Sequence, residues 1–246
     1  MTDDILAKVR KILAKAEDPA ATPEEAETYT AKAAEIIAAY GIDRALLAEE
    51  VPTSDVVGDR VVVLDAPYAL DKAGLLSTVA VRLRCRPVQR VRYADRTKEI
   101  SLHLFGYDSD LSRVEVLYTS LLLQATTLLT RTPVPAGEHP AAYRRSWLAG
   151  FTSAVSRRLV EAEDRAETRA RENESGTPRR RSVGLVLADR SDAVRRAVED
   201  EYPSLRRAPG RQLSGSGGRA GWSAGQRADL GGTPWVGATG RPRIAG

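Results

Sequence analysis

Apolar residues recur every three or four positions along the first forty residues. The first run comprises Ile5, Leu6, Val9, Ile12, Leu13 and Ala16, and the second comprises Ala26, Tyr29, Ala33, Ile36, Ile37 and Tyr40. This spacing places apolar side chains on one face of a helix. It predicts two amphipathic helices, over about residues 2–17 and 23–40, joined by a short connection that packs them antiparallel.

Residues typical of the first and last turns of helices support these boundaries. Thr22 can cap the second helix, Pro23 suits its first turn, and Glu25 completes a capping box. Gly41 can adopt the left-handed conformation that ends a helix, so we expect the second helix to stop there. A further helical turn follows at 44–50, and residues 1–50 are predicted to form an N-terminal helical hairpin domain.

The next segment changes to a strand pattern. Residues 56–64 are rich in valine and predict a strand, and residues 69–84 predict a helix. Residues 87–93 and 99–105 predict a β-hairpin. In its second strand, Ile100, Leu102 and Leu104 alternate with Ser101 and His103, which indicates a half-buried strand.

Two long helices are predicted next, over about 108–131 and 140–173. Asp108 or Ser109 can cap the first of them. The last third of the second, 161–174, is almost wholly charged, so we expect it to project into solvent. Residues 183–188 predict a strand that rejoins the sheet, and Ser191 can cap a short helix after it. Residues 55–203 are thus predicted to form an α+β domain.

Residues 204–246 are predicted to form a Gly/Arg-rich tail. Gly217, Gly221 and Gly225 lie four positions apart, which allows either a flexible segment or a short helix with a closely packed face of small residues. Residues 231–246 are expected to be disordered. The predicted fold class is therefore α+β, with an N-terminal helical hairpin, a small mixed sheet packed with long helices, and a disordered C-terminal tail.

Charge is distributed unevenly along the chain. Residues 176–246 contain 13 arginines, no lysine and six acidic residues, a net charge of +7, whereas the first 175 residues carry −3. Such an excess suggests an anionic partner, although a solvated basic tail has the same composition. The ratio of 31 arginines to six lysines reflects a GC-rich coding sequence more simply than a selection for arginine chemistry.

Composition excludes several classes of protein. A single cysteine, Cys85, forms no internal disulfide, and two histidines cannot build a zinc cluster without several carboxylates. The start of the chain lacks an apolar signal segment, and no run is long enough to span a bilayer. The glycine-rich stretch 214–218 lacks the lysine and hydroxyl of a phosphate-binding loop. We expect a cytoplasmic protein with no cofactor, no metal and no membrane partner.

The run ILAKVRKILAKAE at 5–17, TPEEAE at 22–27 and YGID at 40–43 together resemble the opening of the domain of unknown function (DUF) 2786 family. LFGYDSD at 104–110 and WLAGF at 147–151 are more loosely similar to the region that commonly follows this domain. The resemblance implies a helical start to the fold and a bacterial, often actinobacterial, or phage origin. It implies no established reaction, ligand or catalytic residue.

Candidate catalytic residues are few. Ser101 and His103 share a strand face but lie roughly 6–7 Å apart, too far for a nucleophile–base bond. A strand-surface histidine is the simpler interpretation of His103. Cys85 stands between Arg84 and Arg86, which could activate its thiol, but a small packing residue is the simpler alternative.

Arginine clusters are the main candidates for a binding site. The candidate nucleic-acid-binding residues are Arg179, Arg180, Arg181, Arg206, Arg207, Arg211 and Arg219. Flexible cations suffice for nonspecific contacts with DNA or RNA phosphates. The predicted function is a binding or interaction protein that is not an enzyme. The alternatives are an enzyme of unrecognised type with a site near His103 and Asp108, and an oligomeric scaffold. The sequence leaves the oligomeric state open.

Overall fold

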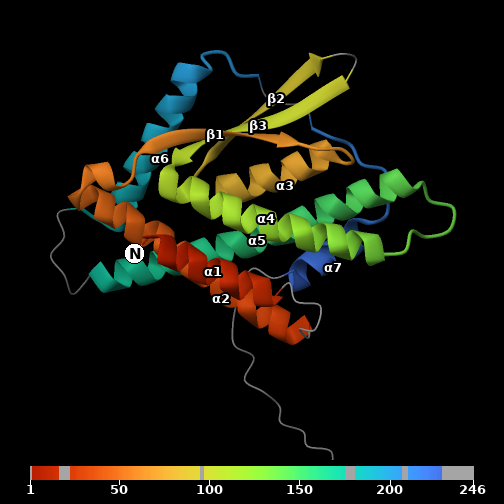
Figure 1. Cartoon of the computed structure of the whole chain (residues 1–246), viewed down its shortest axis with the longest axis horizontal. Coiled ribbons are helices and arrows are strands. Elements are labelled where there is room, and N and C mark those ends of the chain that lie inside the picture. The colour runs from red at the N-terminus through yellow and green to blue at the C-terminus, as the bar shows by residue number, and fades with distance from the viewer. Residues whose placement is uncertain (1, 17–22, 95–96, 175–180, 207–209, 229–246) are drawn as a thin grey trace, which may run out of the picture.

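The computed structural model describes residues 2–16, 23–94, 97–174, 181–206 and 210–228 (Figure 1). In chain order the elements are α1 (Thr2–Ala16), α2 (Pro23–Glu50), the 3₁₀ turn η1 (Pro52–Ser54), β1 (Val57–Leu64), α3 (Ala69–Arg82), β2 (Arg86–Ala94), β3 (Thr97–Tyr107), α4 (Asp108–Arg131), α5 (Pro140–Glu174), α6 (Val183–Glu201) and α7 (Gly218–Arg227). The α+β class predicted from the sequence is confirmed.

The strands form an antiparallel sheet with the order β1-β3-β2. One face carries Ile100, Leu102 and Leu104, which join the main core with α3 and α4. On the other face, Val88 and Phe105 pack against α6. Figure 1 shows α5 beyond α3 and α4, away from the sheet, with α1 and α2 along the same side of the body. The predicted hairpin is thus confirmed, with its turn at 95–96 outside the described residues.

Helix α2 continues through Gly41 to Glu50, so the predicted stop at this glycine is wrong. The position needs a glycine for another reason, because a Cβ on Gly41 would lie 2.1 Å from Nη1 of Arg113. Ile42 and Ala45, which follow, are buried against α6 and continue the apolar face of the helix. Gly41 therefore allows the side chain of Arg113 to pack closely against α2, and it does not end the helix.

Residues 183–188 are the start of helix α6, so the predicted final strand is wrong, and the sheet is antiparallel in the described residues where a mixed one was expected. The buried residues Val183, Val186, Leu187, Arg190, Val194 and Val198 follow helical spacing. The backbone N–H of Leu185 donates to the Ser182 side chain, which makes Ser182 the N-cap. The predicted cap, Ser191, lies inside the helix.

Helix α4 begins at the predicted position with a different cap. Neither Asp108 nor Ser109 caps it through its own side chain. Instead, the carboxylate of Asp55, from the segment before β1, accepts hydrogen bonds from the backbone N–H of Ser109 at 3.0 Å and from its hydroxyl at 2.6 Å. A carboxylate at a helix N-terminus is favoured by the helix dipole. This contact fixes the start of α4 against the linker.

The last third of α5 does not simply project into solvent, as its charge suggested. Ala162 and Glu163 are buried, and Ala166 and Ala170 pack against the cluster that joins α2 to α6. Helices α2 and α6, from distant parts of the sequence, cover one side of this charged segment, and its other side is exposed. Local composition could not reveal such coverage.

The glycine-rich segment after residue 210 contains helix α7, which packs against α5 (Figure 1). An added Cβ would lie 2.4 Å from the carbonyl oxygen of Tyr143 at Gly217 and 1.8 Å from that of Trp147 at Gly221. The docked helix is therefore the correct one of the two alternatives, and this part of the expected tail is ordered. Residues 231–246 lie outside the described residues.

Candidate functional site

The structure does not gather the candidate nucleic-acid-binding arginines into one cluster. Arg179, Arg180 and Arg207 lie outside the described residues. Arg181, just before α6, pairs with Glu49 of α2 at 3.6 Å and also with Asp189. These carboxylates neutralise Arg181 locally, so its contribution to an anion site is reduced.

Arg211 also has a carboxylate partner. Its Nη1 lies 2.9 Å from Oδ1 of the buried Asp71 in α3, and Nε of Arg145 lies 3.9 Å from the other oxygen. The pair ties the segment before α7 to α3. Arg206 and Arg219, in contrast, are exposed and form no ion pair with any residue that the structure describes. The role of the arginines in binding stays a prediction.

His103 is buried, with 6% of its surface exposed, so its interpretation as a strand-surface histidine is wrong. Its Nε2 lies 2.8 Å from Oδ2 of Asp59 on β1, and its Nδ1 lies 2.7 Å from the hydroxyl of Tyr202 at the end of α6. Both ring nitrogens are thus engaged, and the imidazole joins α6 to the sheet. A general base needs a nitrogen that can face a substrate.

Asp108 does not converge on His103. The two are separated by five positions along an extended strand, roughly 16 Å at the usual rise. A shallow hollow of about 300 Å³ near His103 is lined by Asp59, Asp200 and Glu201 together with apolar residues. Three carboxylates at one opening disfavour an anionic substrate. The predicted alternative site near His103 and Asp108 is therefore not assembled.

A network of buried ion pairs, which the sequence analysis missed, lies between α4, α5 and α6. The fully buried Arg113 donates from Nη1 to Oδ1 of Asp110 at 2.7 Å and from Nη2 to Glu163. Arg84 Nη1 lies 2.6 Å from the other oxygen of Glu163. Burial alone would lower the pKa of Arg113, but Glu163 and Asp110 outweigh it and hold that pKa above its usual value.

Arg190 of α6 extends the network to the segment before β1. Its Nη2 donates to Asp55 at 2.7 Å and to Asp110 at 3.2 Å, and its guanidinium lies 3.5 Å from the ring centroid of Tyr107. Stacking on an aromatic face suits the planar guanidinium. The network connects five segments that are far apart in the sequence, so its geometry indicates a structural role.

One sequence signal could have pointed to this network. Asp110 and Arg113 lie three positions apart beside Leu111, Val114 and Leu117, on the apolar side of α4. Charges on an apolar helix face are buried only when they are paired. The sequence alone, however, does not identify Glu163 or Arg190 as their partners.

Cys85 is a packing residue, which confirms the simpler of its two alternatives. The thiol is 2% exposed and contacts Gly106 so closely that a Cβ there would lie 2.5 Å from Sγ. Burial raises the pKa of the thiol well above its usual value, and the nearby Asp110 adds to the rise. The neighbouring Arg84 interacts with Glu163 and does not activate the thiol.

We therefore expect Cys85 to be unreactive toward Ellman's reagent in the native protein at pH 8, because the thiolate is the nucleophile. Titration in denaturant should release one equivalent of chromophore per chain, since this is the one cysteine of the sequence. A rapid, stoichiometric reaction of the native protein would show that the thiol is accessible and ionised.

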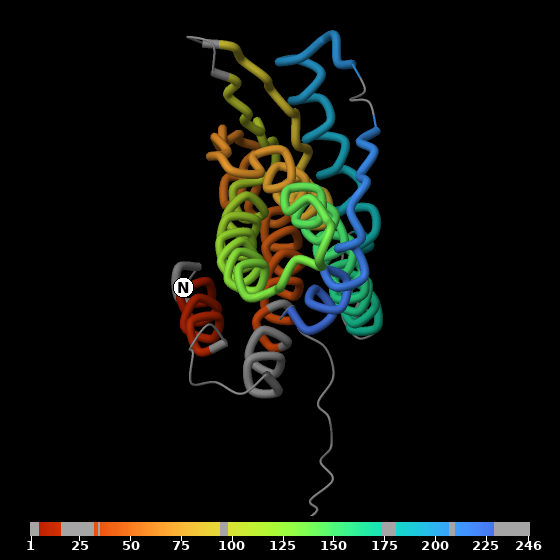
Figure 2. Tube along the Cα trace, turned by 90° about the vertical axis from the view of Figure 1, so that its right-hand side faces the viewer, coloured from red at the N-terminus to blue at the C-terminus, as the bar shows by residue number. Residues whose placement is uncertain are grey.

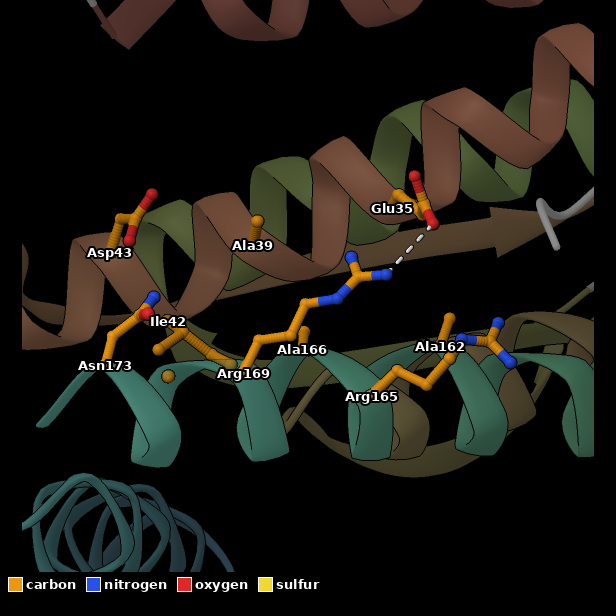
Figure 3. A pocket seen from close by; sticks show the side chains of 10 residues that line it. Glu35, Ala39, Ile42, Asp43, Ala162, Arg165, Ala166, Arg169 and Asn173 are labelled. Atoms are coloured by element: carbon orange, nitrogen blue, oxygen red, sulfur yellow. Dashed lines mark ion pairs between the residues drawn. The ribbon is translucent and has the colours of Figure 1, made fainter. Parts of the chain in front are cut away.

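A groove of about 200 Å³ lies between α2 and α5 (Figure 3). Ala39 of α2 lines one side of the groove and Ala162 and Ala166 of α5 line the other, and Arg169 reaches across it to Glu35 at 3.6 Å. Sites for organic ligands usually exceed about 300 Å³. The groove is thus a gap between small side chains with a salt bridge across it.

Within the described ranges, no group of three or more His, Cys, Asp or Glu side chains is arranged to hold a metal ion. None of the described helices combines the length and the apolar character needed to cross a membrane.

Comparisons with known proteins identify one segment. No curated protein and no solved structure shows significant similarity to the chain. The model of the family described as protein of unknown function (DUF2786) matches residues 4–44, which cover most of α1 and most of α2. The N-terminal helical hairpin of this chain thus carries the sequence pattern of the DUF2786 family, as its resemblance indicated.

Proposed function

We propose that the protein binds nucleic acid, without catalysing a reaction, through exposed arginines of its C-terminal third. The observation that carries this proposal is that several arginines of this region, unlike the buried Arg190 and the paired Arg181 and Arg211, are exposed and have no acidic partner among the described residues. Arg196, Arg206, Arg219 and Arg227 are all exposed, and none forms an ion pair with a described residue. Exposed, unneutralised cations are what contacts with a phosphate backbone require.

Shortening the chain is not a suitable test. Removing everything after residue 175 would delete α6 and α7, which supply Val194, Val198 and Ala224 to the buried clusters. Loss of binding could then result from unfolding. The test must instead change surface charges in the full chain and leave the core intact.

The experiment compares the wild type with the triple variant Arg206→Gln, Arg219→Gln, Arg227→Gln. Fluorescence anisotropy measures binding to a labelled duplex DNA and a labelled RNA at about 50 mM salt, where electrostatic contacts are strong. We expect the wild type to bind both polymers and the variant to bind each more weakly. The matched control is Arg157→Gln, Arg169→Gln, Arg171→Gln, three exposed α5 arginines that form ion pairs.

Two results would contradict the proposal. The first is an absence of wild-type binding at this low salt concentration, and the second is a C-terminal variant that retains the affinity of the control variant. Because all substituted side chains are exposed, circular dichroism should show unchanged folding in both variants.

A further inference from the structure

The end of the β2–β3 hairpin is a two-stranded ribbon that extends beyond the rest of the sheet. β1 pairs with β3 as far as Leu64–Ile100, whereas β2 and β3 remain paired through Arg92–Glu99 to Ala94–Thr97. Figures 1 and 2 both show this end of the hairpin projecting from the helices. Within the described part of the chain, neither a third strand nor a helix covers this end of the hairpin.

The ribbon is basic. Among its described residues it carries Arg92 and Lys98 against one acidic residue, Glu99, and the half-buried Arg90 lies just before it, opposite Ser101 in the three-stranded part of the sheet. Side chains alternate between the two faces of a strand, so Arg90 and Arg92 lie on one face and Lys98 lies on the other. None of the three cations forms an ion pair with a residue that the structure describes. Their charge is therefore available to an anionic partner from both faces.

An exposed aromatic residue accompanies these cations. Tyr93 is paired with Lys98 across the ribbon, and 77% of its surface is exposed, the highest value among the described large apolar residues. Tyrosine is enriched at binding interfaces because it combines a large apolar ring with a polar end. Packing within the fold does not explain an aromatic ring at this position.

We propose that the β2–β3 ribbon inserts into a groove of double-stranded DNA, with Arg90, Arg92 and Lys98 contacting the phosphates on its two sides. A two-stranded ribbon fits the major groove, which is about 12 Å wide. Single strands are usually bound by stacking bases on aromatic side chains. On this sheet, Phe105 and His103 are buried beneath α6, which leaves Tyr93 as the one highly exposed aromatic ring of the described strands, too few for a platform that stacks successive bases. The geometry thus favours a duplex.

The ribbon lies at the same end of the molecule as the C-terminal end of α6 in both views (Figures 1 and 2). Tyr202, which ends α6, contacts His103 on the sheet, and the segment carrying Arg206 begins just after it. The exposed acidic residues 199–201 at the end of α6 would repel a duplex, so the groove contact is assigned to the ribbon and not to this end of the helix. This inference rests on the proposed function and adds the kind of nucleic acid and the element that enters its groove.

Charge on an edge strand has another use, because it prevents two sheets from pairing edge to edge. That role requires cations on β2 but predicts no difference in DNA affinity when they are removed. It predicts self-association of the uncharged protein, which size-exclusion chromatography detects. The binding experiment and the size measurement together separate the two roles.

The test uses the full chain with the variant Arg90→Gln, Arg92→Gln, Lys98→Gln and the α5 triple variant described above as its control. Both lose three positive charges, but α5 is separated from the sheet by α3. With a labelled 20-base-pair duplex at about 50 mM salt, we expect the ribbon variant to lose about tenfold or more in affinity. The control should remain close to the wild type, and the wild type should prefer the duplex to a single strand.

A second variant, Glu99→Gln, removes the acidic residue of the ribbon and should strengthen duplex binding while leaving the fold intact. The inference is wrong if the ribbon variant binds as tightly as the control, if Glu99→Gln does not strengthen binding, or if the wild type prefers the single strand. If the ribbon variant self-associates and keeps its affinity, edge protection is the role of the cations. Absence of wild-type binding to any nucleic acid would overturn the proposed function as well.

Discussion

Replacing Arg113 with methionine is expected to lower the free energy of unfolding by about 3–5 kcal/mol, the range for breaking a buried ion pair. Arg113 is fully buried and pairs with Asp110 and Glu163. Methionine fills much of the same volume but leaves both carboxylates without this partner in the interior. Urea unfolding followed by far-UV circular dichroism measures the change.

The matched control is Arg157→Met. Arg157 also pairs with a glutamate, Glu161, but its side chain is 65% exposed, so the loss should stay below about 0.5 kcal/mol. Gly41→Ala provides an independent check. Alanine favours a helix more than glycine does, yet its Cβ would collide with Arg113, so we expect destabilisation. Equal stabilities of Arg113→Met and Arg157→Met would show that the network adds nothing to folding.

Replacing Gly221 with alanine is expected to displace α7 from α5 and to cost about 1–3 kcal/mol, as overpacking usually does. The added Cβ would lie 1.8 Å from the carbonyl oxygen of Trp147 and 2.6 Å from its carbonyl carbon. Both are backbone atoms inside α5, so no side-chain rotation relieves the contact. Hydrogen exchange of the α7 amides should become much faster, and urea unfolding should report the loss.

Gly210→Ala is the control for this substitution, because no heavy atom lies within 4 Å of the added Cβ. It should leave exchange in α7 and the free energy of unfolding unchanged. Gly225→Ala should behave like Gly221→Ala, since its Cβ would lie 2.6 Å from the carbonyl oxygen of Phe151. Slow exchange of α7 in the Gly221 variant would mean that the helix does not need this close approach.

Long elements with a clear period were predictable from the sequence. The apolar spacing around Leu111, Leu121 and Phe151 is sustained over many turns, so it identified α4 and α5 to within a few residues. The alternation of Ile100 and Leu102 with polar residues likewise identified β3. In these elements, local pattern and tertiary burial agree.

The wrong predictions arose where a short sequence pattern was compatible with two local structures. Residues 183–188 form an apolar run that is short enough for a buried strand or for the first turns of a helix. The cap at Ser182 and the later buried positions Val194 and Val198 show that this run forms the first turns of helix α6. Gly41 resembled a helix end, but it is required by Arg113, which lies 72 positions later in the chain.

The buried ion pairs and the His103 contacts could not be predicted for a related reason. Asp59, His103 and Tyr202 meet because β1, β3 and the end of α6 converge in space, and no spacing in the sequence encodes that convergence. The basic ribbon was partly predictable from the sequence. Its alternating arginines at positions 90 and 92 are visible in the sequence, but their isolation from other elements is a property of the fold.

The salt dependence of duplex binding tests the central claim, electrostatic recognition of nucleic acid, most directly. Affinity is measured between about 50 and 200 mM salt for the wild type, the ribbon variant and the C-terminal arginine variant. The logarithm of the association constant should fall linearly with the logarithm of salt concentration, and each lost phosphate contact should reduce the slope by about 0.9. A wild-type affinity that does not change with salt, or no binding at the lowest concentration, would contradict the account.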